Sequence, residues 1–198
     1  MMIEGRQEGL PPLPTGERVA GAKRRPGEGA AVRTHASSST DDGAGRQGAL
    51  IRPAAVADLP ACAAIINDYI DATDWLPRIH SREQLAGFFT AELLERRTVL
   101  VAELDGDVAG YMTMGAKGMV PALYLAPHAR GMGIGSMMLD RAKAMSPDGV
   151  ELTVFEPNLQ ARRFYEREGF SEVPEARKVE EEGIPILLMR WTGGGGAA

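Results

Sequence analysis

Three glycines at alternate positions, Gly131, Gly133 and Gly135, occupy the point where a helix is expected to begin. They lie in YLAPHARGMGIGSMMLDRAKA (124–144), between a short apolar strand and a helical pattern. Glycine is a poor helix former, so this arrangement costs stability unless a ligand must approach the backbone. A glycine-rich turn at a helix start exposes unpaired N–H groups, and the helix dipole adds positive charge. The loop therefore favours a phosphate or a pyrophosphate, to which Arg130 adds a charge-assisted contact.

Known phosphate-binding patterns differ in how well they fit these residues. A P-loop needs a lysine after its last glycine, whereas Ser136 follows Gly135 here. The dinucleotide fingerprint G-x-G-x-x-G opens a first strand–helix unit, whereas this loop reads G-x-G-x-G and lies two-thirds along the chain. A third pattern, R-x-x-G-x-G, fits with Arg130, Gly133 and Gly135. For these six residues alone, a merely tight turn is the alternative explanation.

Hydrophobic periodicity predicts the elements that position this loop. Strands are expected at 49–54, 98–104, 107–114, 119–125, 150–155 and 185–191, and another near 172–173. Helices are expected at 55–72, 81–95, 134–145 and 158–170. This order indicates a mixed α/β sheet whose centre is one strand–helix–strand unit, Val120–Phe155.

Three short sequence patterns add detail to this prediction. Asp105-Gly106 separates two β-rich runs and is typical of a tight hairpin turn. Ser81, followed by Gln84, supplies N-terminal capping chemistry for the second helix. The helix 134–145 is expected to present one stripe of Ile134, Met137, Met138, Arg141 and Met145.

Two motifs at the right separation resemble those of the GNAT superfamily of acetyl-CoA-dependent N-acetyltransferases. The segment 124–144 is similar to the family's pyrophosphate-binding strand, loop and helix. NLQARRFYEREGF (158–170) is similar to the second motif, and VAELDGDVAGYMTM (101–114) to the preceding hairpin. The resemblance covers roughly 50–191 and implies a mixed, mostly antiparallel central sheet with a parallel strand–helix–strand cofactor unit, flanked by helices.

The resemblance also implies a site for acetyl-CoA, from which the acetyl group passes directly to a primary amine of a small molecule or peptide. The pyrophosphate is expected beside Arg130, on the amides of Gly131, Met132, Gly133, Ile134, Gly135 and Ser136. The pantetheine arm is expected along the strand edge of Leu123, Tyr124 and Leu125, where an amide near Leu125 polarises the thioester carbonyl. Asn158 is implied as a cofactor contact, and a helix N-cap is its compatible alternative role.

Tyr165 is the candidate general acid for the leaving thiolate, with a core aromatic as the alternative. The base is less defined, because Thr153 occupies the slot where many relatives carry glutamate. Glu151 and Glu156 are candidate bases, each also explained as a solvated carboxylate.

Acceptor preference is expected from the segments 67–81 and 177–191. Asp71, Asp74 and Trp75, with 180–182, are expected to form an acidic, aromatic-edged mouth for a cationic amine. An exposed loop with solvated charges is the alternative.

Composition bounds the remaining possibilities. The 198 residues are expected to form one domain at 49–192, between a disordered tail at 1–48 and a flexible tail at 193–198.

The net charge of −5 argues against nucleic acid as a partner. No apolar run long enough for a membrane span is present, and a single cysteine, Cys62, suits a reducing, cytoplasmic location. The spacing of cysteine and histidine predicts no metal site.

Two other functions stay open at this point. One is a regulatory module that binds acetyl-CoA without transferring the acetyl group. The other is a dinucleotide enzyme, against which the absence of a glycine fingerprint in the first strand–helix unit argues. A homodimer is compatible with the resemblance.

Overall fold

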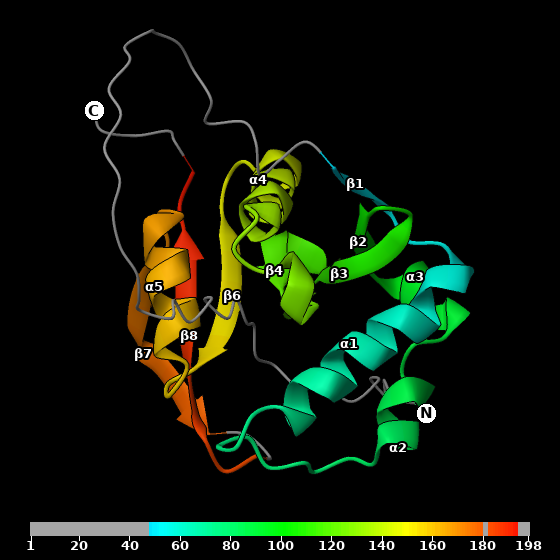
Figure 1. Ribbon diagram of the computed structural model, residues 1–198. Coiled ribbons are helices and arrows are strands. Elements are labelled where there is room, and N and C mark those ends of the chain that lie inside the picture. The colour runs from blue at the N-terminus through cyan, green and yellow to red at the C-terminus, as the bar shows by residue number, and fades with distance from the viewer. Residues whose placement is uncertain (1–47, 180–181, 194–198) are drawn as a thin grey trace, which may run out of the picture.

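The computed structural model describes residues 48–179 and 182–193. Apart from residues 48 and 193, the tails expected at the two ends lie outside these residues, and so do residues 180 and 181 of the acidic run. The elements named below follow the labels of Figure 1.

The first sheet is antiparallel throughout and has the strand order β1-β2-β3-β5. Its strands are Ala49–Pro53 (β1), Thr98–Leu104 (β2), Asp107–Met114 (β3) and Ala122–Leu125 (β5). The predicted hairpin turn is confirmed, because Asp105 and Gly106 join β2 to β3 with φ of 54° and 91°. Both residues therefore adopt the left-handed backbone that an Asp-Gly turn tolerates.

The second sheet has the order β4-β6-β8-β7. Its strands are Met119–Val120 (β4), Val150–Phe155 (β6), Ser171–Val179 (β7) and Pro185–Trp191 (β8). Among the described strands, only β4 and β6 pair in parallel, with Val120 beside Leu152. The predicted mixed, mostly antiparallel arrangement with a parallel strand–helix–strand unit is therefore confirmed.

The predicted strand 119–125 is wrong in one respect, because it is two strands separated at Pro121. Before this residue the chain pairs with β6, and after it the chain pairs with β3. Proline has no N–H to donate to a ladder, so a change of partner occurs readily at this position. As a result the two sheets diverge beyond Pro121, and they lie on opposite sides of Figure 1.

Five α-helices lie within the described residues. They are Leu59–Asp71 (α1), Arg82–Gly87 (α2), Ala91–Arg96 (α3), Ile134–Met145 (α4) and Leu159–Arg167 (α5). Short 3-10 turns precede α1 at Val56–Asp58, precede β4 at Ala116–Gly118, and follow β5 at Pro127–Ala129.

The predicted helix 81–95 is also divided. Its start is confirmed, because Ser81 and Gln84 form a capping box with bonds of 3.2 and 2.8 Å. The helix ends near Gly87, and Thr90 then caps α3 with extended backbone. Phe89, between the two helices, is buried against the ring of Tyr111 at 5.4 Å. Tertiary packing of this phenylalanine accompanies the break in the helical pattern.

Two hydrophobic clusters cover opposite faces of the sheets. One cluster joins α4 and α5 to inward residues such as Leu125 and Leu152. The other joins α1, α2 and α3 to Tyr124, Phe155 and neighbouring residues. In Figure 1, α1 crosses below the first sheet while α5 packs on the second. The diverging strands β5 and β6 are consequently covered by different helices on their two faces.

The predicted apolar stripe of α4 is right at Ile134 and Met138, which are buried, and wrong at its C-terminal end. Met145, placed on that stripe by periodicity, is 47% exposed, and Arg141 is exposed as well. The buried positions are Ile134, Gly135, Met138, Leu139 and Ala142. Small residues at 135 and 142 allow close packing, and apolar periodicity alone does not detect them.

Candidate functional site

The glycine loop joins the 3-10 turn at Pro127–Ala129 to α4 and contains two left-handed residues. Gly131 and Gly133 have φ of 78° and 77°, which strongly favour glycine. Gly133 is the N-cap of α4 and offers no side-chain acceptor, so the first-turn amides of the helix have no side-chain cap. A Cβ atom added at Gly131 would meet no atom within 4 Å. Bare main-chain amides thus lie next to open space at a helix N-terminus.

Arg130 is held between the strand end and α1. Its Nε donates to the carbonyl oxygen of Leu125 at 3.1 Å, and its guanidinium carbon lies 6.0 Å from the centre of the Tyr69 ring. Burial lowers the pKa of Arg130, because a partly desolvated cation is less stable. The positive charge is therefore fixed beside the glycine loop without an ion-pair partner among the described residues.

Strand β5 presents a backbone edge toward the divergence between the sheets. It is the last strand of the first sheet, and the Ala126 amide donates to the Ala109 carbonyl at 2.8 Å. Hydrogen-bonded pairs alternate along an antiparallel ladder, so Tyr124 also bonds toward β3. The amides of Leu123 and Leu125 consequently point away from β3 and are not used by the ladder with that strand.

Tyr165 lies on α5 and belongs to the hydrophobic cluster that also contains Leu123 and Leu125. The side chain is fully buried between Phe164 and Phe170, with ring centres 5.4 and 5.8 Å away. Its hydroxyl has no hydrogen-bond partner within the described residues. The aromatic packing fits a core residue, and the unpaired buried hydroxyl is compatible with a further hydrogen-bond partner, so the role of general acid stays a prediction.

Asn158 caps the same helix, as one of its two predicted roles requires. Its side-chain oxygen accepts from the amide of Ala161 at 3.2 Å, and the residue is buried. The N-cap role is therefore confirmed, and the cofactor contact stays a prediction.

The two candidate bases are both ion-paired. The Arg190 guanidinium contacts the Glu151 carboxylate at 2.6 Å. Glu151 lies where β6 pairs in parallel with β4. Arg177 contacts Glu156 at 2.7 Å and lowers the pKa of that carboxyl through this hydrogen bond. A lowered pKa weakens a carboxylate as a base. Between them, Thr153 has a buried hydroxyl with no partner among the described residues.

The two aspartates of the predicted acceptor mouth differ in their ion pairs. Asp71 is bound by Arg78 and Arg82, which lower the pKa of its carboxyl. Asp74 is exposed and forms no ion pair in the described part of the chain. Trp75 packs edge-on against Phe155 at 5.7 Å. Of these two aspartates, Asp74, next to Trp75, is therefore the one whose carboxylate has no positively charged partner among the described residues.

A contact between α4 and α5 was not predicted from the sequence. Ser136 donates to the Glu168 carboxylate at 2.5 Å, and Lys143 donates to the Glu168 carbonyl at 2.8 Å. These bonds connect the first and the last turn of α4 to Glu168 at the C-terminal end of α5. Their partners lie 32 and 25 residues apart, beyond the reach of local patterns.

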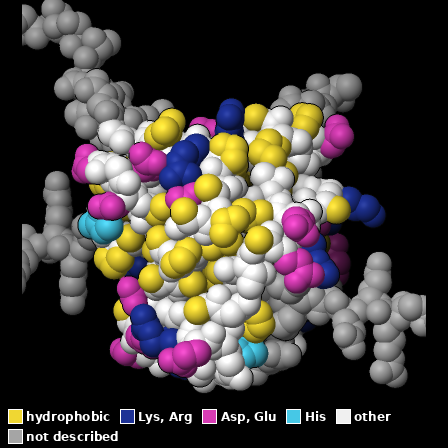
Figure 2. All heavy atoms as spheres, turned by 90° about the vertical axis from the view of Figure 1, so that its right-hand side faces the viewer, with side chains coloured by type: hydrophobic (Ala, Val, Ile, Leu, Met, Phe, Trp, Pro, Cys, Tyr) yellow, Lys and Arg dark blue, Asp and Glu magenta, His cyan; other side chains and the backbone are white. Residues whose placement is uncertain are grey.

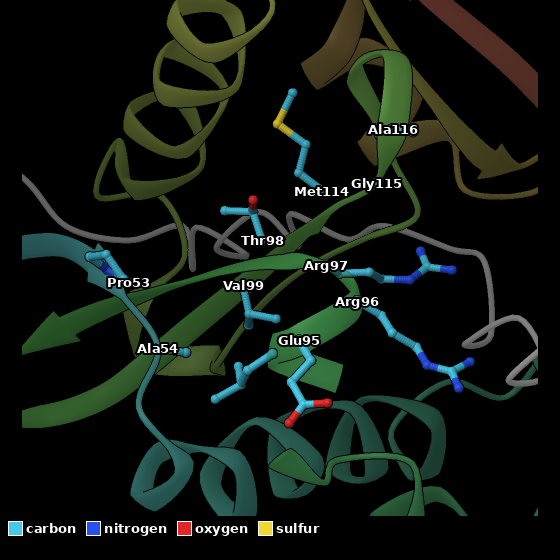
Figure 3. A pocket seen from close by; sticks show the side chains of 11 residues that line it. Pro53, Ala54, Glu95, Arg96, Arg97, Thr98, Val99, Met114, Gly115 and Ala116 are labelled. Carbon is cyan, nitrogen blue, oxygen red and sulfur yellow. The ribbon is translucent and has the colours of Figure 1, made fainter. Parts of the chain in front are cut away.

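A pocket of about 550 Å³ lies elsewhere, between α3 and the ends of β1, β2 and β3. Figure 2 shows hydrophobic side chains gathered on the side of the molecule where these elements lie. In Figure 3, Pro53, Ala54 and Val99 line one part of this pocket, and Arg96 and Arg97 extend from another. None of the predicted site residues lines it, so it is separate from the glycine loop.

Other classes of site are not found. The described residues contain no group of three or more acidic, histidine or cysteine side chains that could hold a metal ion. Among the same residues, no helix is long and apolar enough to span a membrane.

Comparisons with known proteins agree with this geometry. A model of the acetyltransferase (GNAT) domain matches residues 62–193. The peptidyl-lysine N-acetyltransferase YjaB of Salmonella typhimurium is 33% identical over 128 residues, covering 64% of this chain and 85% of that protein. The solution structure of apo YjaB from Escherichia coli aligns with a TM-score of 0.60 at 26% identity, covering 74% of this chain and 99% of that one.

A further structure shares the fold. The putative acetyltransferase yncA from Salmonella typhimurium, solved with acetyl-CoA, has a TM-score of 0.57 at 24% identity, covering 76% of this chain and 96% of that one. The chain belongs to the GNAT acetyltransferase family. It is an acetyl-CoA-dependent N-acetyltransferase, and acetyl-CoA is its acetyl donor.

Proposed function

We propose that the protein transfers the acetyl group directly from acetyl-CoA to a primary amine, and that a peptidyl lysine is its preferred acceptor. The lysine preference rests on the named activity of the YjaB relative. The exposed carboxylate of Asp74 beside Trp75 supports an acceptor that carries positive charge.

One observation carries the proposed position of the acetyl donor. The outward amides of β5 lead, within a few residues, to the bare amides of the glycine loop. A donor bound by its pyrophosphate at 131–136 and by its pantetheine arm at Leu123–Leu125 would have its thioester at the divergence of the sheets. There the Leu125 amide would donate to the carbonyl oxygen as negative charge develops on it.

Tyr165 is proposed as the acid that protonates the departing thiolate. Its buried, unpaired hydroxyl supports this role, because bound donor would supply the missing partner. The amine must lose a proton before it attacks. Glu156 follows β6 where the sheets have diverged, so it is a better-placed base than Glu151, although Arg177 holds its carboxylate.

A thiol-release assay tests the function. Acetyl-CoA would be offered with a lysine-containing peptide, a peptide whose lysines are already acetylated, free amino acids and a polyamine. We expect release only with acceptors that carry a free amine, and the highest kcat/KM with the lysine peptide. Release that is independent of the amine would contradict direct transfer, and preference for a polyamine would contradict the acceptor class.

The regulatory alternative makes a different prediction in the same assay. Acetyl-CoA would bind, yet no amine would accelerate thiol release above hydrolysis. The homodimer and the cytoplasmic location expected from the sequence stay predictions.

A further inference from the structure

Helix α1 and the loop that follows it span the divergence between the two sheets. Tyr69, in the last turns of α1, packs on Tyr124 of β5 with ring centres 5.7 Å apart. Trp75, in the loop, packs on Phe155 of β6 at the same separation. The six-residue step from Tyr69 to Trp75 therefore bridges β5 and β6 on one face, where their backbones have separated.

The loop between α1 and α2 also approaches the second sheet. In Figure 1 it leaves the lower end of α1, reaches the ends of β7 and β8, and returns to α2. Leu76 is buried, and Leu76 and Pro77 line a small pocket together with Glu182 of the turn between β7 and β8. The loop thus lies close to the turn that joins β7 to β8.

Arg78 fastens this loop back to α1. Its guanidinium donates to the Asn67 side-chain oxygen at 2.9 Å, to the Asn67 carbonyl at 3.0 Å and to the His80 carbonyl at 3.3 Å. Its Nε donates to Asp71 at 3.0 Å, and a second nitrogen contacts the same carboxylate oxygen. One side chain therefore joins two residues of α1, Asn67 and Asp71, to the end of the loop.

The surrounding groups favour this position for a cation. The C-terminal end of α1 carries the negative end of the helix dipole. Arg82 binds the other oxygen of Asp71 and contacts Asp68 at 2.8 Å, and the Asn67 amide donates to the Arg82 carbonyl at 3.2 Å. The start of α2 is thereby tied to the same point as the loop.

We propose that Arg78 is a positioning residue that sets the separation of Tyr69 and Trp75, and with it the width of the acceptor opening. The inference rests on the proposed function, because it assumes that the amine enters between β5 and β6 on the α1 face. Arg78 itself touches neither reacting group. It acts by holding Asp74 and Trp75 at a fixed place relative to β5.

A planar guanidinium is required for this role. Lysine keeps the charge but has one nitrogen, so it cannot contact Asn67, Asp71 and His80 together. Arg78→Lys should therefore preserve the ion pair with Asp71 and lose the fixed loop. Arg78→Ala removes both.

Steady-state kinetics with the lysine peptide and acetyl-CoA test the proposal. For Arg78→Ala we expect kcat/KM for the peptide to fall by about ten- to a hundredfold, and Arg78→Lys should fall in between. The KM for acetyl-CoA should stay within about twofold, because the glycine loop is untouched. Arg96→Lys, which alters an exposed pair with Glu92 on α3, is the matched control and should leave both values unchanged.

Amide hydrogen exchange supplies a readout that needs no activity. Faster exchange confined to residues 72–81 in Arg78→Lys would support the proposal even if the lysine peptide proved not to be an acceptor. A folded Arg78→Ala protein with unchanged peptide kinetics would overturn it. An equal loss for peptide and acetyl-CoA, or faster exchange throughout the molecule, would also overturn it, because either result indicates general destabilisation.

Discussion

Tyr165 combines burial with an unpaired hydroxyl, a costly combination in a folded chain. Leaving a buried donor unbonded costs about 1–3 kcal/mol. Tyr111, Thr113 and Thr153 also have buried hydroxyls without a partner among the described residues, so the proposed role of Tyr165 rests on its place in the 158–170 motif as well. The rings of Phe164 and Phe170 fix its orientation. A hydroxyl held in this way can donate to the departing sulfur without reorganisation.

Replacing Tyr165 with phenylalanine isolates that hydroxyl. We expect kcat to fall by roughly 10²–10⁴ at most, because a thiol with a pKa of about 8.5 is already a tolerable leaving group. Acetyl-CoA affinity, measured by calorimetry, should not change. Wild-type turnover in the thiol-release assay would remove Tyr165 from the mechanism.

Asp58 gives the protein an acid-sensitive contact outside the site. Arg52 binds its carboxylate at 2.6 and 2.9 Å, and the Ala55 amide donates to it at 2.7 Å. The Arg52 hydrogen bonds lower the pKa of Asp58 below its value in the unfolded chain. The resulting stability is therefore present above about pH 4 and is lost as the pH falls through the lowered, folded-state pKa.

Asp58→Asn tests this linkage. We expect the variant to unfold about 1–3 kcal/mol more easily at pH 7, because hydrogen bonds to a charged partner are lost. The difference from wild type, measured by urea unfolding, should shrink below pH 4, where wild type loses the same contact. A difference that stays constant down to pH 3 would show that ionisation of Asp58 is not its origin.

At the scale of elements, α5 depends on a cap whose residue is also a candidate cofactor contact. Asn158 accepts from the Ala161 amide, and aspartate caps helices about as well as asparagine. The Asn158→Ala and Asn158→Asp variants therefore separate the two roles.

The alanine variant should lose about 1 kcal/mol of stability, and the aspartate variant should retain it. If Asn158 also contacts acetyl-CoA, both variants should bind it more weakly, because aspartate has no amide donor and adds negative charge near a pyrophosphate. Thermal unfolding measures the first effect and calorimetry the second. Wild-type acetyl-CoA affinity in Asn158→Asp would limit the residue to capping.

Which elements could be predicted from the sequence depends on how local their signals are. The Asp105-Gly106 turn, the capping box at Ser81 and the glycine loop are each encoded within a few residues, and the structure contains them where they were expected. The division at Pro121 and the break before Thr90 depend on tertiary partners. Periodicity over a single segment cannot detect such partners.

At the scale of the whole molecule, the site also combines features that have local sequence signals with features that depend on residues far apart in sequence. The candidate acid and the cofactor loop were predicted from motif residues close in sequence, and their roles stay predictions. The contacts of Glu151, Glu156 and Asp71 with arginines were not, because most of these partners come from other elements. The contact between Ser136 and Glu168 and the fastening of the loop by Arg78 were missed for the same reason.

The central claim at this scale is that bare amides at 131–136 bind the pyrophosphate of acetyl-CoA where the two sheets diverge. Gly133→Val tests it, since a β-branched residue is strongly disfavoured at φ of 77° and the loop must rearrange. Gly87→Ala is the matched control, because α2 has helical backbone there and an added Cβ meets no atom within 4 Å.

Calorimetric titration of both folded variants with acetyl-CoA, and with S-acetylpantetheine, which lacks the pyrophosphate, is the most direct measurement. We predict that Gly133→Val weakens acetyl-CoA binding at least about tenfold, corresponding to 1.4 kcal/mol, and leaves S-acetylpantetheine binding unchanged. Undiminished acetyl-CoA affinity in a folded Gly133→Val protein would contradict the assignment of this loop.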